Sequence, residues 1–156
     1  MGRLEQLRSL SRVERRHLAR ALFWLPATRV LLRVIGFRRT LRFYQQNNVL
    51  AAEGSPANHD LDTATMAARM ISIAANHGLY RAHCLPKALV LIKFLQARDI
   101  PCNLKIGTRR QGEEFGAHAW VECAGVAINE DTDVESRYAV FNAPIERRTK
   151  SESHHQ

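Results

Sequence analysis

The segment Gly116–Cys123, "GAHAWVEC", has the alternating pattern of a β-strand and carries a histidine near its middle. Because successive side chains of a strand point to opposite faces, the alanines and Val121 share one face, and His118 and Trp120 share the other. The small apolar face suits packing against a helix. A buried histidine needs a hydrogen-bond partner. His118 is therefore either a core residue with a structural partner or a base that takes part in chemistry.

The residues around this segment predict an antiparallel sheet. Apolar and polar residues alternate from Cys102, which indicates a strand that ends at Gly107. A polar loop, "TRRQGEEF", is expected at 108–115, and Ala124-Gly125 fits a two-residue hairpin turn. The four expected strands lie at 102–107, 117–123, 126–128 and 138–141.

Helical patterns fill the N-terminal part of the chain. Ser11 and Glu14 form an S-x-x-E capping box, and apolar residues at helical spacing continue from there to about Tyr44. Pro26 is expected to break or kink this stretch. The pattern therefore predicts two basic amphipathic helices.

Two more helices precede the predicted sheet. One is expected at 61–76, ended by Gly78, and the other runs from Cys84 to about Arg98 with Pro86 in its first turn. Helices followed by an antiparallel sheet make an α+β fold. The expected organisation is a basic helical region, a loop, a core and a disordered tail, at residues 1–46, 47–60, 61–145 and 146–156.

Composition and charge bound the function. The chain has 156 residues, 46% hydrophobic and 24% charged, which is typical of one globular domain. Residues 1–50 hold 11 Arg against 2 Glu, a net charge of +9 in a chain whose total is +8. This basic region is either a solvated helix face or a surface for an anionic partner, such as a nucleic acid, a membrane or an acidic protein. Its few aromatic residues are not interleaved with the arginines, which disfavours nucleic acid.

No integral membrane segment or secretory signal is expected. The most apolar early stretch, residues 21–37, contains Pro26, Arg29 and Arg33, so it is a poor membrane span. No uninterrupted apolar run with a small-residue cleavage site follows the basic N-terminus. We therefore expect a cytoplasmic protein.

The three cysteines have different settings. Cys84 lies at a predicted helix start, where the local positive potential favours a thiolate. It is either a nucleophile or a small buried hydrophobe. Cys102 and Cys123 fall in strand patterns and are expected to be core residues. The odd count and the lack of CxxC pairs argue against a disulfide framework and against a structural zinc site.

The hairpin suggests which acid accompanies His118. If Ala124-Gly125 is a two-residue turn, paired residues have numbers that sum to 249, so Asp131 faces His118. A one-residue bulge would bring Glu130 there instead. A cysteine on a helix start, a histidine on a strand and an acid on the next strand suit nucleophilic acyl transfer.

Three stretches carry a family resemblance: "CLPKALVLIKFLQARDIPCNLKIGTRR", "EFGAHAWVEC" and "GVAINEDTDVESRYAVF". Together they resemble the transglutaminase-like core of the lasso-peptide B2 proteins, the leader peptidases of lasso-peptide biosynthesis. The resemblance implies a papain-like core in which Cys84 is the nucleophile and His118 the base. The acid of this family follows an asparagine. Here Glu130 occupies that slot and Asp131 follows it, so the two acids remain alternatives.

The resemblance implies a cysteine protease that removes the leader from a ribosomally made precursor peptide. A lasso cyclase would then close the freed core peptide. A leader-recognition protein (RRE, B1-type) is expected in trans, because no such domain is visible in the chain. No metal or organic cofactor is expected. The alternatives are another Cys–His acyl-transfer enzyme, such as an amidase or a transglutaminase-type transferase, and a non-catalytic basic interaction module.

Overall fold

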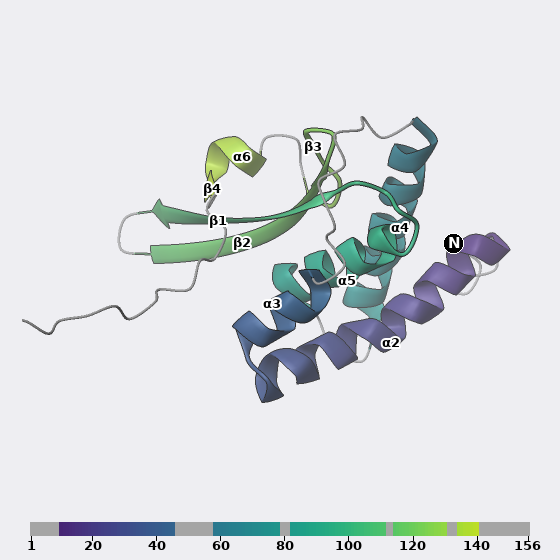
Figure 1. The fold of residues 1–156 in the computed structure, drawn as a ribbon, viewed down its shortest axis with the longest axis horizontal. Coiled ribbons are helices and arrows are strands. Elements are labelled where there is room, and N and C mark those ends of the chain that lie inside the picture. The colour runs from purple at the N-terminus through teal and green to yellow at the C-terminus, as the bar shows by residue number, and fades with distance from the viewer. Residues whose placement is uncertain (1–9, 46–57, 79–81, 112–113, 131–133, 141–156) are drawn as a thin grey trace, which may run out of the picture.

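The computed structural model describes residues 10–45, 58–78, 82–111, 114–130 and 134–140. Its elements in chain order are α2 (Arg12–Val34), α3 (Phe37–Gln45), α4 (Asn58–His77), α5 (Cys84–Gln96), β1 (Asn103–Gln111), β2 (Glu114–Cys123), β3 (Val126–Ala127), α6 (Val134–Arg137) and β4 (Ala139–Val140). The helices α2, α3 and α5 lie on one side of a small antiparallel sheet, and α6 lies on the other (Figure 1). The helix α4 packs against both α2 and α5. This is the predicted α+β arrangement.

The helix α2 begins at the predicted capping box. The Ser11 hydroxyl accepts a hydrogen bond from the Glu14 N–H at 3.2 Å, and the Glu14 carboxylate accepts one from the Ser11 N–H at 2.8 Å. Two hydrogen bonds hold the pKa of Glu14 below its usual value. The bond with the Ser11 backbone has the larger effect, and the bond with the Ser11 side chain has the smaller one. Such a cap stabilises a helix by about 1 kcal/mol.

The basic stretch forms two helices, as predicted, but they do not separate at Pro26. The helix α2 continues through this proline, so the expected break is wrong. Leu25 and Thr28 are buried on either side of it, and this packing supports the helix where the proline removes a hydrogen bond. The chain turns at Gly36 instead, with a φ of 81° that suits glycine. None of the helices in the described part of the chain has the length and apolar character that a membrane crossing requires.

The helix α4 begins earlier than predicted. Residues 58–60, expected at the end of a loop, already belong to it, and the rest of that loop lies outside the described residues. Gly78 follows the end of the helix, and its N–H donates to the Ala74 carbonyl at 2.8 Å. A Cβ at Gly78 would lie 2.5 Å from that same carbonyl oxygen, so a side chain would disturb this ending. The predicted role of Gly78 in closing the helix is confirmed.

The strands β1 and β2 form a long hairpin, paired from Asn103–Glu122 to Gln111–Glu114. The polar segment 108–115 was expected to be a loop, but residues 108–111 end β1 and residues 114–115 begin β2, so this prediction is wrong for the described residues. Pairing requires only the backbone, and an antiparallel ribbon that projects into solvent can carry polar side chains. Figure 1 shows this end of the hairpin lying beyond the helices.

The hairpin between β2 and β3 has the predicted two-residue turn. Ala124 and Gly125 have φ angles of 52° and 76°, and Cys123 pairs with Val126, as in a type I′ turn. The expected register is therefore confirmed at the turn. The strand β3 spans only two residues, in a sheet of order β3-β2-β1-β4. The chain thus leaves the ladder before it reaches the level of His118.

The main core cluster joins residues of α2, α4, α5 and β2. Leu91 and Leu95 of α5 are almost fully buried in one cluster with Ala119 and Val121 of β2. The predicted helix-facing side of this strand is confirmed. Trp120 points to the other face and is also fully buried.

Cys102 and Cys123 are buried, as predicted, but they are joined by a disulfide. The expectation of no disulfide is therefore wrong. Their Cα atoms are 4.3 Å apart because they lie one step beyond the Asn103–Glu122 pair of the hairpin. Spacing along the sequence does not reveal this register. A cross-link that closes a loop of this size stabilises a fold by about 3 kcal/mol.

Candidate active site

Cys84 is the first residue of α5 and is the cysteine outside the disulfide. Its neighbour His83 is the N-cap, has an extended backbone and makes no side-chain capping bond. The first turn of the helix contains no acidic residue. Because N–H groups at a helix start lack intrahelical partners, they create a positive potential at this end of α5. The residue is partly buried.

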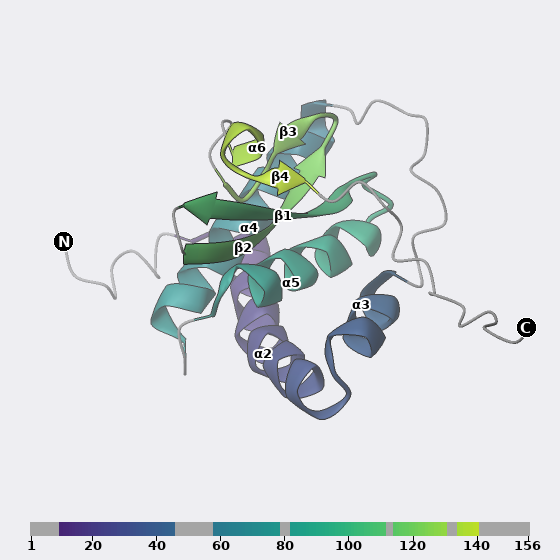
Figure 2. The same cartoon turned by 90° about the vertical axis from the view of Figure 1, so that its left-hand side faces the viewer.

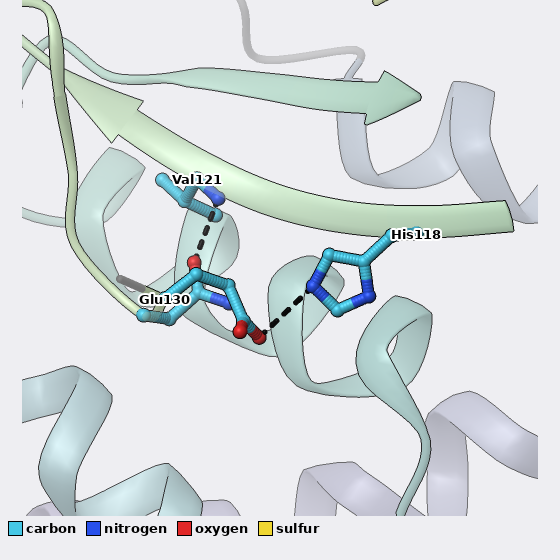
Figure 3. Close-up of polar contacts among 4 residues, drawn as sticks. His118, Val121 and Glu130 are labelled. Atoms are coloured by element: carbon cyan, nitrogen blue, oxygen red, sulfur yellow. Dashed lines mark hydrogen bonds and ion pairs between the residues drawn. The ribbon is translucent and has the colours of Figure 1, made fainter. Parts of the chain in front are cut away.

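His118 lies on β2 and contacts a carboxylate. Its Nε2 is 3.2 Å from Glu130 Oε1, and the two side chains are 19% and 23% exposed. Figure 3 shows both side chains on the side of β2 that faces away from β1. A carboxylate can only accept, so this contact puts a proton on Nε2 and leaves Nδ1 as the basic nitrogen of a neutral ring.

Glu130 is positioned by the residues before it. The Ile128 N–H donates to the Val121 carbonyl at 2.9 Å, and the Val121 N–H donates to Asn129 Oδ1 at 2.7 Å. These two bonds continue the contact with the edge of β2 after β3 has ended, and Figure 3 shows the one that Val121 makes. They fix the chain at the level where Glu130 reaches the imidazole.

The structure describes only one of the two candidate acids. Glu130 contacts His118, whereas Asp131 lies outside the described residues. The register that predicted Asp131 assumed that β3 continues as a strand. Asn129 instead uses its side chain in place of a backbone acceptor, and the next residue then turns toward the histidine.

Aromatic rings adjoin the histidine on the other side. The Tyr138 ring stacks on the His118 ring with centroids 5.1 Å apart and planes 24° apart. The centroid of the Trp120 ring lies 6.2 Å from that of the His118 ring and 6.3 Å from that of the Tyr138 ring. The sequence pattern did not point to Tyr138 as a site residue. Only its place in the short predicted strand at 138–141 could have indicated a position near the sheet.

Within the described residues, no group of three or more His, Cys, Asp or Glu side chains could hold a metal ion. The groups that the structure offers for chemistry are a thiol, an imidazole and a carboxylate. These groups perform nucleophilic and acid–base steps.

A family model, the transglutaminase-like superfamily, matches residues 24–143, which is more than half of the chain. The chain belongs to this superfamily. Its membership confirms the predicted transglutaminase-like fold, with the helix opened by Cys84 packed on a small antiparallel sheet. No solved structure shows significant similarity to the chain.

A curated relative supports the resemblance to lasso-peptide processing proteins. The chain is 31% identical over 71 residues to the microcin J25-processing protein McjB of Escherichia coli. The match covers 46% of this chain and 33% of McjB, so the chain spans about a third of the length of that relative.

Proposed function

We propose that the protein is a cysteine peptidase that removes the leader from a ribosomally synthesised precursor peptide during lasso-peptide maturation. The observation that carries this proposal is the contact of His118 with Glu130 on a strand that packs against the helix opened by Cys84. The superfamily membership supports a cysteine-type enzyme, and the similarity to a microcin-processing protein supports a peptide substrate.

The path of the chain supports pairing Cys84 with His118. The end of α5 leads through five residues to Cys102, which is bonded to Cys123 at the end of β2. The helix runs beside β2 in the same direction (Figure 2). Twelve helical steps of about 1.5 Å cover nearly the same length as five strand steps of about 3.4 Å. Counted back from Cys123, we expect His118 and the first turn of the helix to lie at a similar level along β2, with His118 on the opposite face from Ala119 and Val121.

The proposed reaction has two stages. His118 Nδ1 takes the thiol proton of Cys84, and the sulfur attacks the carbonyl carbon of the bond between leader and core. The carbon–nitrogen bond breaks as the imidazolium gives its proton to the amine of the core, which leaves the leader as a thioester on Cys84. Water, deprotonated by His118, then releases the leader and restores the thiol.

Two further groups assist this reaction. Glu130 holds the ring with Nε2 protonated and stabilises the imidazolium. The backbone N–H of Cys84, at a helix start, is the natural donor to the oxyanion that forms in each stage.

The basic helices supply a surface for protein partners. Phe23, Val30 and Val34 of α2 are 65%, 59% and 74% exposed, and exposed arginines lie among them. Apolar patches within a polar surface are typical of protein interfaces. We expect this surface to bind a leader-recognition protein (RRE, B1-type) in trans, and the lasso cyclase to act on the freed core.

Two alternatives make different predictions. An amidase or a transglutaminase-type transferase would use the same Cys84 and His118 but would leave a leader–core precursor intact. A non-catalytic interaction module would have an inert Cys84 and would depend only on its basic helices.

The direct test is cleavage of a leader–core precursor peptide, with the leader-recognition protein added, followed by mass spectrometry. We expect free leader and a core with a new amine from the wild type, and no cleavage from Cys84→Ala. A covalent adduct of the leader with Cys84 in a rapid acid quench would identify the thioester. An intact precursor in the presence of every component would contradict the proposal.

A further inference from the structure

Tyr138 has an unusual setting for a residue at the end of a four-residue helix. Its ring is stacked on the His118 ring at 5.1 Å, and the Arg109 guanidinium lies 5.4 Å from the centre of the Tyr138 ring. The residue immediately precedes β4, which pairs with β1 at only two positions, Gly107–Val140 and Thr108–Ala139. A short segment therefore places an aromatic ring against the imidazole.

Gly107 makes this close approach possible. It is paired with His118 across the hairpin and with β4 on its other side. A Cβ at Gly107 would lie 2.8 Å from Tyr138 Cβ and 3.1 Å from two ring carbons of Trp120. Any larger residue would push these aromatic side chains away from the strand.

From these contacts we infer that Tyr138 is a positioning residue for the proposed catalytic histidine. Glu130 binds one edge of the His118 ring and Tyr138 covers a face, so the ring cannot rotate about its bond to the chain without losing one of the two contacts. The two contacts therefore hold the ring in one orientation, with Nε2 at Glu130. The inference rests on the proposed function, because it assigns a role in the same site.

The stacked Tyr138 ring also affects the stability of a positive charge on His118. The faces of aromatic rings attract cations, so Tyr138 favours the imidazolium that forms when Cys84 loses its proton. The charged and titratable groups around the stack are Glu130 before α6, Arg109 on β1 and, in the proposed pair, Cys84 at the start of α5. We therefore expect loss of the ring to weaken the assistance that His118 gives to Cys84, and so to slow the reactions of this thiol.

Two variants separate the ring from its hydroxyl: Tyr138→Leu and Tyr138→Phe. For each we would measure the rate at which iodoacetamide modifies Cys84 between pH 5.5 and 9. We expect Tyr138→Leu to slow the reaction near pH 7 about three- to fivefold, and Tyr138→Phe to stay within about twofold of the wild type. Equal rates for wild type and Tyr138→Leu would overturn the inference. If Tyr138→Leu does not fold, Tyr138→Met replaces it.

A second measurement keeps this inference separate from the proposed function. The chemical shifts of the His118 ring protons, measured by NMR and assigned with His118→Ala, depend on the stacked Tyr138 ring. They do so whether or not the protein is a peptidase. We expect Tyr138→Leu to move them downfield and Tyr138→Phe to leave them nearly unchanged. If they do not move, the stacking is not real. If the resonances move but the rate of Cys84 modification is the same in wild type and His118→Ala, the stacking is real and the proposed function fails.

Discussion

Glu130 Oε1 lies 3.2 Å from His118 Nε2, and the preceding residue, Asn129, is bonded through its side chain to the backbone of β2. The imidazole and the carboxylate are thus held by one strand and by the chain that follows its hairpin. Two neighbouring carboxylates were candidates from the sequence, and this contact favours one of them. It also leads to a prediction that separates them.

Replacing Glu130 by glutamine should lower kcat for precursor cleavage by roughly two to four orders of magnitude, because the amide can present the wrong hydrogen-bonding group to Nε2. Single-turnover assays would measure this. Glu122→Gln is the matched control, since Glu122 is a carboxylate on the same strand that pairs with Lys105 instead, at 3.7 Å. If Asp131→Asn is inactive and Glu130→Gln is not, Asp131 is the acid.

Gly107→Ala should reduce both cleavage and stability. The added methyl group would meet Tyr138 Cβ at 2.8 Å, and overpacking of this kind destabilises a protein by about 1–3 kcal/mol. Gly116→Ala is the control on the same hairpin, because a Cβ there meets nothing closer than the Arg109 carbonyl oxygen at 3.8 Å. Thermal unfolding and single-turnover rates would be compared. Equal effects of the two substitutions would show that the space at Gly107 is not needed.

Charge reversal at Arg12, Arg15 and Arg16 to glutamate tests the basic helices as a docking surface. All three side chains are exposed near the start of α2. We expect the triple variant to weaken delivery of the precursor by the recognition protein about tenfold or more, with kcat unchanged at saturation. Titrations with the recognition protein at two salt concentrations would measure this. If the triple variant and the wild type give the same titration curve, these arginines do not bind the recognition protein, and the helices are a solvated scaffold.

His17 predicts a pH dependence of stability. It is 1% exposed, its Nε2 accepts from the Arg98 guanidinium at 2.8 Å, and burial, followed by Arg98, Arg20 and Arg16, lowers its pKa. An unfolded histidine takes up a proton near pH 6.5, whereas the folded one resists protonation. The unfolded state therefore binds more protons below about pH 6.5, so stability is complete above that value and falls as the pH decreases.

Urea unfolding at pH 7.5 and pH 5.5 would measure this effect. The variant His17→Gln keeps an acceptor for Arg98 but does not titrate, so its stability should change less between the two pH values. Equal changes in wild type and variant would assign the pH dependence to other groups.

Much of the fold was predictable because it depends on local chemistry. The capping box at Ser11, the hairpin turn at Ala124-Gly125 and the alternation around His118 each have a physical cause within a few residues. Predictions failed where tertiary contacts or strand pairing determine the local structure. The helix continues through Pro26 because its neighbours are buried, and polar residues 108–111 and 114–115 extend the hairpin because the backbone pairs.

The site shows the same division. Cys84 and His118 were predicted as site residues from a helix start and a strand, and the structure places them on these elements. The choice of Glu130 depended on the side-chain bond of Asn129, and the Cys102–Cys123 disulfide depended on hairpin register. Tyr138 was missed because its contact with His118 requires the absent side chain of Gly107, which lies 31 positions away in the chain.

The most direct test of the account is alkylation of the cysteines across pH, mapped by peptide mass spectrometry in wild type and His118→Ala without reductant. We predict that Cys84 alone is modified, rapidly even near pH 6–7 where an unassisted thiol is mostly protonated, and that His118→Ala slows it about tenfold or more. The disulfide-bonded Cys102 and Cys123 should stay unmodified. A Cys84 that reacts as slowly in wild type as in His118→Ala would contradict the catalytic pair.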